Sequence, residues 1–160
     1  MQVRRVGVGD VETVRALRLD ALLDAPEAFG STYEREVAFP RSVWAERLST
    51  PGNATLICEA DGDSCGMVTV VRDDRDSKLA WLAGMWIVPT ARGTGVADLL
   101  MTAVLRWAQQ ECLTTVRLHI TDGNDHAERL YRRHGFNPTG RSVAGSREVT
   151  EVEMERTASG

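Results

Sequence analysis

The sequence predicts one mixed α/β sheet with helices on both of its faces. Two observations carry this prediction. The apolar periodicity changes repeatedly along the 160 residues between a helical repeat and strand-like alternation. A long and nearly all-apolar stretch, residues 78–88, suits a central strand that is buried on both faces. The expected element order is β-α-α-β-β-β-α-β-α-β-β, which mixes helices and strands along the whole chain.

The first third of the chain predicts one short strand, residues 2–6, and two helical regions. Asp10 is expected to cap the first helix, which residues 24–30 break. The second helical region is interrupted at Pro40 and ends at residues 51–53. The apolar face of the first helix holds Val11, Val14, Leu17 and Ala21.

Three strands are expected next. Residues 54–60 and 65–72 alternate as strands and are joined through residues 61–63, Asp-Gly-Asp, which is a hairpin signal. The charged residues 73–77 indicate a solvated loop that leads into the central strand at residues 78–88.

The second half of the chain contains the clearest helical pattern. Its buried face is expected to consist of Val96, Leu99, Leu100, Ala103, Val104 and Trp107. Residues 115–121 predict a strand, residues 125–134 a short helix that Gly135 ends, and residues 149–156 the last strand. The stripe of the short helix holds Ala127, Leu130, Tyr131 and His134, and the last strand places Val152 and Met154 on one face.

Length and composition predict a single domain over residues 1–160, with residues 157–160 as a frayed tail. The net charge of −4, from 19 basic and 23 acidic residues, argues against a nucleic-acid partner. No apolar run indicates a membrane span or a secretory signal. Three cysteines without zinc-site spacing indicate reduced thiols. We therefore expect a cytoplasmic protein without a metal and without a membrane association.

The sharpest local feature is the segment at residues 87–97, Ile-Val-Pro-Thr-Ala-Arg-Gly-Thr-Gly-Val-Ala, between the central strand and the best helix. A strand that turns through small residues into a helix leaves backbone N–H groups free at the positive end of the helix dipole, which can hold a pyrophosphate. Arg92 can add a charged contact. A merely tight turn explains the same residues. No Gly-Lys-Ser/Thr follows, so a nucleotide-binding P-loop is excluded.

A second motif, N-x-x-A-x-x-L-Y-x-x-x-G-F, spans residues 124–136. Together with the pattern V-x-P-x-x-R-G-x-G-V-A at residues 87–97, it resembles the GCN5-related N-acetyltransferase (GNAT) family. The resemblance covers residues 79–136 and extends more weakly over residues 17–39. It implies a mostly antiparallel sheet of about seven strands with one splayed strand, and transfer of an acetyl group from acetyl-CoA to an amine.

The resemblance also implies roles for particular residues. The loop would hold the CoA pyrophosphate, the exposed amides of the splayed strand would pair with the pantetheine arm, and Asn124 would hydrogen-bond the pantetheine. The residues so placed at the cofactor are Met85, Trp86, Ile87, Val88, Arg92, Gly93, Thr94, Gly95, Val96, Ala97 and Asn124.

Tyr131 and His119 are the candidate catalytic residues. The resemblance gives Tyr131 the role of general acid for the departing thiolate, and a tyrosine hydroxyl suits this role because it stays protonated at neutral pH. Its alternative is a core aromatic on the helix stripe. His119 takes the place where some members of the family carry a glutamate base, and alternation with Leu118 and Ile120 turns it to the other side of the sheet. Its alternative is a hydrogen-bonded structural histidine.

The acceptor site is expected near the N-terminal helices, where the resemblance places it. The candidates Phe29, Tyr33 and Glu34 combine aromatic rings with a carboxylate that could receive a cationic amine. A solvated helix face explains the same residues. The identity of the amine and a homodimer both stay open. A non-catalytic CoA-binding module is the alternative function, against which the presence of Asn124 and Tyr131 argues.

Overall fold

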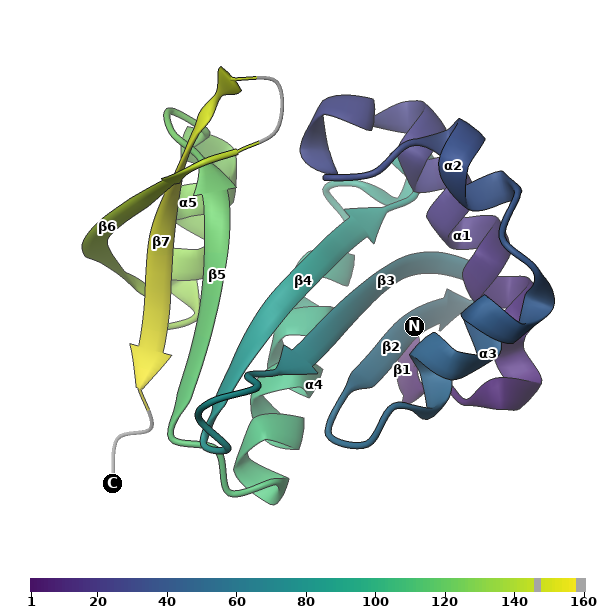
Figure 1. Cartoon of the computed structure of the whole chain (residues 1–160), viewed down its shortest axis with the longest axis horizontal. Helices are drawn as coiled ribbons and strands as arrows, with labels where there is room; N and C mark the ends of the chain where they lie inside the picture. The colour runs from purple at the N-terminus through teal and green to yellow at the C-terminus, as the bar shows by residue number, and fades with distance from the viewer. Residues whose placement is uncertain (146–147, 158–160) are drawn as a thin grey trace.

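The computed structural model describes residues 1–145 and 148–157, which form one open sheet covered by helices on both faces (Figure 1). The spatial order of the strands is β1-β2-β3-β4-β5-β7-β6. Only β4 and β5 run parallel, and the other neighbours are antiparallel. The predicted fold class is therefore confirmed. The strands are β1 (Gln2–Arg5), β2 (Ala54–Ala60), β3 (Asp63–Arg72), β4 (Leu79–Ile87), β5 (Thr115–Thr121), β6 (Asn137–Ala144) and β7 (Thr150–Thr157).

The helices are divided between the two faces of the sheet. One face carries α1 (Val11–Asp24), α2 (Tyr33–Val37) and α3 (Arg41–Ser49), and the other carries α4 (Val96–Gln110) and α5 (Asp125–Arg133) (Figure 1). Short 3₁₀ turns lie at Val8–Asp10, Pro26–Ala28 and Pro89–Ala91. In the described part of the chain, no helix combines the length and the apolar character that a membrane span requires.

Helix α1 forms where it was predicted, and all four residues of its predicted apolar face are buried. The role of Asp10 differs from the prediction. It stands at the N-cap position of α1, but its side chain makes no cap hydrogen bond there. Its carboxylate instead accepts from the Gly7 N–H at 3.0 Å and from Arg4 at 2.9 Å, because an extra 3₁₀ turn precedes the helix.

Two strand predictions need correction. The hairpin between β2 and β3 is tighter than expected: Ala60 pairs with Asp63, so only Asp61 and Gly62, with φ of 52° and 83°, form the turn. Strand β4 is central but not uniformly buried, because Ala83 is exposed where the strand passes the open part of the sheet.

Helix α4 supplies the apolar layer under β2, β3 and β4. Of its predicted face, Val96, Leu100, Val104 and Trp107 are buried, but Leu99 is 38% exposed at the edge of the stripe. Met154 on β7 is fully buried and Val152 packs against the same core, as predicted. The predicted frayed tail falls mostly outside the described residues, since Thr157 ends β7.

Candidate active site

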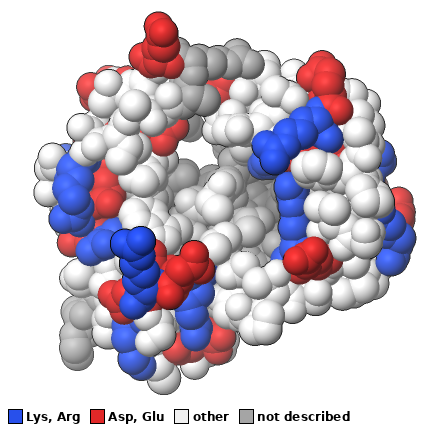
Figure 2. All heavy atoms as spheres, in the orientation of Figure 1, with Lys and Arg blue, Asp and Glu red and all other residues white. Residues whose placement is uncertain are grey.

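The parallel pair β4–β5 holds together along only part of its length. Cα pairing covers Leu79 with Thr115, Ala80 with Val116 and Trp81 with Arg117, and beyond Trp81 the two strands part (Figure 1). In the space-filling view, the surface is hollowed over this parted region, and basic and acidic side chains lie on both sides of the hollow (Figure 2). The second half of β4 therefore has a strand neighbour on one edge only.

The ladder between β3 and β4 determines which backbone groups of β4 face the gap, which is the space between β4 and β5 beyond Trp81. The Val88 N–H donates to the Cys65 carbonyl oxygen at 2.9 Å, so Val88 faces β3. Because antiparallel pairs alternate, Trp86 also faces β3, and Met85 and Ile87 direct their N–H and C=O groups to the opposite edge. Of the four predicted cofactor residues on β4, two thus present backbone groups to the gap.

The loop after β4 brings further backbone donors to the same edge of the sheet. Gly93 and Gly95 have φ of 78° and 92°, and an added Cβ at either position would meet no atom within 4 Å, so the loop surface is open. The first intrahelical bond of α4 runs from the Leu99 N–H to the Gly95 carbonyl oxygen. The N–H groups of Val96 and Ala97 therefore have no partner within the helix, and the helix dipole adds positive potential beside them.

Arg92 is held back against the end of α1. Its guanidinium donates to Asp24 at 2.5 Å and to the Ile87 carbonyl oxygen at 3.1 Å. The Trp86 indole N–H donates to the same Asp24 oxygen at 2.9 Å. These two hydrogen bonds, that of Trp86 first, lower the pKa of Asp24. The contact joins α1, β4 and the glycine loop into one unit.

Helix α5 approaches the gap from the side of β5. Asn124 caps it, because its Oδ1 accepts from the Ala127 N–H at 3.2 Å. Tyr131 is 8% exposed and contacts Phe136 edge to face, with the ring centroids 5.8 Å apart. Burial raises the pKa of Tyr131 to about 12, so its hydroxyl stays protonated at neutral pH. Tyr131 belongs to the same apolar cluster against which Met85 and Ile87 pack.

His119 lies on β5, on the face opposite to the one that α4 covers. Its ring is exposed and stacks on the indole of Trp81, with the centroids 5.1 Å apart and the planes inclined by 28°. Across the ladder it stands opposite Glu153, whose carboxylate accepts from Thr139 and Arg141. The predicted turn of His119 away from the Leu118 and Ile120 core is therefore confirmed.

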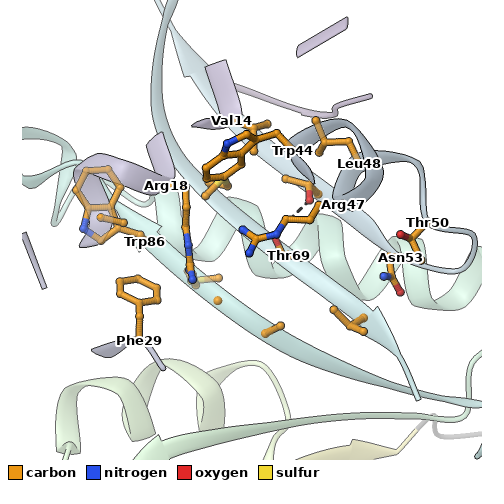
Figure 3. Close-up of a pocket in the computed structure, with 17 residues that line it drawn as sticks. Val14, Arg18, Phe29, Trp44, Arg47, Leu48, Thr50, Asn53, Thr69 and Trp86 are labelled. Carbon is orange, nitrogen blue, oxygen red and sulfur yellow. Dashed lines mark hydrogen bonds between the residues drawn. The ribbon is translucent and has the colours of Figure 1, made fainter. Parts of the chain in front are cut away.

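A cavity of about 280 Å³ lies on the face of the sheet that α1 and α3 cover, between these helices and strands β2–β4 (Figure 3). It reaches β4 at Gly84, Met85 and Trp86, beside the parted strands. At the far end lie Thr50 and Asn53. The side chains of Arg18 and Arg47 extend over the strands between these ends (Figure 3).

The predicted acceptor residues are not brought together. Phe29 lines the cavity, whereas Tyr33 and Glu34 do not. Tyr33 packs against the apolar cluster between α1 and α3, and Glu34 is exposed. Sequence reasoning did not single out Arg18 and Arg47. A signal was present, since Arg18 follows Val14 by four residues and precedes Ala21 by three, which puts a charge at the apolar stripe of α1.

The comparisons with known proteins agree with this geometry. The model of the acetyltransferase (GNAT) family matches residues 16–136. An uncharacterized N-acetyltransferase from Mycobacterium bovis is 34% identical over 117 residues, which are 72% of this chain and 72% of that protein.

Solved structures share the fold. The ribosomal-protein-alanine N-acetyltransferase from Brucella melitensis superimposes with a TM-score of 0.80 at 20% identity, covering 99% of this chain and 100% of that one. The yncA protein of Salmonella typhimurium, which is described with its cofactor acetyl-CoA, gives 0.77 at 18% identity, covering 98% and 93%. The fold and the relatives define an acyltransferase. The chain belongs to the acetyltransferase (GNAT) family, as its two motifs predicted.

Proposed function

We propose that the protein transfers the acetyl group of acetyl-CoA to a primary amine by direct attack of the amine on the thioester. The observation that carries this proposal is the parting of β4 and β5 after Trp81, next to the open glycine loop at the start of α4. One edge of the sheet thus offers free backbone groups for an extended arm, and the adjoining loop offers amide donors for a pyrophosphate. A relative of the same fold is described with acetyl-CoA, which supports this donor.

The residues present fit such a donor. Pyrophosphate would be held by the N–H groups of residues 93–97, at a helix N-terminus with no side chain in the way. The amide-bearing arm would pair with the backbone of Met85 and with the Ile87 N–H in the manner of an added strand, since the Ile87 carbonyl oxygen already accepts from Arg92. The Asn124 side chain uses only its oxygen on the helix cap, so its NH₂ group can donate to a carbonyl of the same arm.

In the proposed reaction the neutral amine forms a C–N bond to the carbonyl carbon while the C–S bond breaks. The thiolate takes its proton from the Tyr131 hydroxyl, which burial keeps protonated. The same apolar surroundings would also raise the pKa of the departing thiol, which makes its thiolate a stronger proton acceptor. His119, directly or through water, takes the proton that the amine nitrogen loses as the C–N bond forms. A backbone N–H of β4 polarises the carbonyl.

The test is the release of free CoA from acetyl-CoA in the presence of a panel of amines, with a reaction lacking amine as the control for hydrolysis. We expect release that depends on the amine and equals the acetylated amine formed. Binding of acetyl-CoA without any amine-dependent release would overturn the proposal and favour a non-catalytic CoA-binding module.

We also propose that residues 1–160 act as one domain in the cytoplasm. Cys58, Cys65 and Cys112 are free thiols, which supports a reducing compartment. Fractionation of the native host followed by detection of the chain would test this location.

A further inference from the structure

The cavity beside β4 is positively charged in a mostly apolar wall. Among the described residues that line it, only Arg18 and Arg47 carry a charge. Uncharged polar groups come from Thr50, Asn53, Thr55 and Thr69. The apolar part of the wall consists of Val14, Ala21, Phe29, Trp44, Leu48, Met67, Val71, Ala83, Met85 and Trp86.

Both arginines are fixed by one buried carboxylate. Glu36 on α2 is 0% exposed, and its Oε1 accepts from Arg18 Nε and from Arg47 Nη1, each at 3.0 Å. Its Oε2 accepts from Arg18 Nη2 at 2.9 Å. Burial alone would raise the pKa of Glu36, but the hydrogen bonds, that of Arg18 above all, lower it to about 2. Glu36 is therefore ionised, and the three side chains together keep one net positive charge.

Each guanidinium retains donors that Glu36 does not use. Arg47 donates to Glu36 through Nη1 alone. The Nε and Nη2 atoms of Arg47 have no hydrogen-bond partner among the described residues. Arg18 keeps Nη1, which lies 3.9 Å from where a Cβ at Gly84 would be. Aromatic faces hold both guanidinium groups in place. The Cζ of Arg18 lies 4.7 Å from the ring centroid of Phe29, and the Cζ of Arg47 lies 5.1 Å from that of Trp44. Arginines fixed in this way are prepared for a second carboxylate.

The same charges disfavour a polycationic acceptor. A second cation brought to this cavity would be repelled by the excess positive charge at short range and low dielectric constant. An acceptor with a carboxylate gains two charge-assisted contacts instead, and its amine then lies toward Gly84–Trp86, where β4 faces the gap. The apolar wall would cover a hydrocarbon or aromatic group.

From this arrangement we propose that the acceptor is an amino acid or a close analogue, with a primary amine, a carboxylate that Arg18 and Arg47 bind, and an apolar side chain. The inference rests on the proposed acetyl transfer and specifies its acceptor. It replaces the expected recognition of a cation by the Glu34 carboxylate, because Glu34 is exposed and does not line the cavity.

The first test compares acceptors that differ only in the carboxylate. CoA release is measured with L-phenylalanine against phenethylamine, with L-leucine against 3-methylbutylamine, and with spermidine. We expect kcat/KM to be about 10–100-fold higher for each carboxylated partner, the range that hydrogen bonds to a charged group provide. Equal or better rates with the plain amines or with spermidine would overturn the inference while leaving acetyl transfer intact.

The second test changes the recognising group. Arg47→Gln should remove most of the preference for the carboxylated partner, mainly through KM, and Arg47→Lys should restore only part of it because lysine lacks the planar fork. The control is Arg41→Gln on the same helix, since Arg41 is exposed and does not line the cavity. Unchanged preference in a folded Arg47→Gln protein would contradict the assignment.

A binding measurement separates this inference from the proposed reaction. N-acetyl-L-phenylalanine and N-phenethylacetamide differ by the same carboxylate and need no turnover. Calorimetry should show the first binding about 10–100-fold more tightly, and Arg47→Gln should abolish the difference. Equal binding of the two probes would refute carboxylate recognition, whatever the CoA-release experiment shows.

Discussion

The two sides of β4 are built on different principles. On the side of β5, the candidate donor site consists of backbone groups: parted strand edges at Met85 and Ile87 and the glycine loop before α4. On the side of α1 and α3, the cavity consists of side chains that these two helices, the residues that follow each of them, and strands β2, β3 and β4 contribute. A backbone site needs small residues and a fixed chain path, so it leaves a motif in the sequence. A side-chain site can be assembled from any segments that the fold brings together, so it leaves none.

The largest effect is expected from Tyr131, the proposed general acid at the candidate donor site. Tyr131→Phe removes one hydroxyl and keeps the ring that contacts Phe136. We expect turnover to fall by about 10²–10⁴-fold with acetyl-CoA affinity unchanged, because general acid catalysis is lost while the backbone contacts stay. Steady-state kinetics and calorimetry on one preparation check this. Full activity would return Tyr131 to the role of a core aromatic.

The glycine loop is tested by adding a charge to it. Gly95→Glu places a carboxylate where the pyrophosphate is expected, and acetyl-CoA affinity should fall by about 100-fold or more, with loss of the thermal shift that the ligand causes. Gly95→Asn is the control, because asparagine accepts the left-handed conformation at φ of 92° without adding charge. If the folded Gly95→Glu protein bound acetyl-CoA as the parent does, the donor would lie elsewhere.

A smaller loss is expected at His119, which belongs to the acceptor-facing side of β5. His119→Ala should lower kcat/KM by about 10–100-fold and change the acid limb of its pH profile, since the proposed general base is removed. His119→Gln serves as a control that keeps a polar side chain over Trp81. A pH profile identical to that of the parent would mean that water, and not His119, accepts the proton of the amine.

The smallest effect is expected in the free energy of unfolding, from a change in the cluster of Arg18, Glu36 and Arg47 beside the cavity. Glu36→Gln leaves two arginines without their shared carboxylate, and because both are partly exposed we expect a loss of about 1–3 kcal/mol in the free energy of unfolding at pH 7. The pKa of Glu36 is about 2, below its ordinary value of 4.5, so the stabilisation is complete above about pH 4.5 and vanishes as the pH falls toward 2.

Urea titrations of the parent and the variant from pH 7 to pH 2 measure this difference. The two curves should converge at the acid end. A difference that stayed constant down to pH 2 would mean that Glu36 is not the ionised centre of the cluster.

The sequence predicted the fold and the turn from β4 into α4 well, for physical reasons. Helix α4 and the glycine turn follow from local periodicity and backbone freedom, and β5 was placed at its observed limits, Thr115–Thr121. Asp10 was misassigned because a 3₁₀ turn, set by tertiary contact with Arg4, takes its carboxylate. Arg47 and Glu36 could not be paired in advance, because their contact depends on how α2 and α3 pack.

In the proposed reaction, alternate backbone groups of β4 receive the donor. The most direct measurement is residue-resolved amide hydrogen exchange by NMR, with and without acetyl-CoA. We expect strong new protection at Met85 and Ile87, whose N–H groups face the gap, and little change at Trp86 and Val88, which already pair with β3. Protection that spread evenly over the four residues, or that left Met85 and Ile87 unchanged, would contradict it.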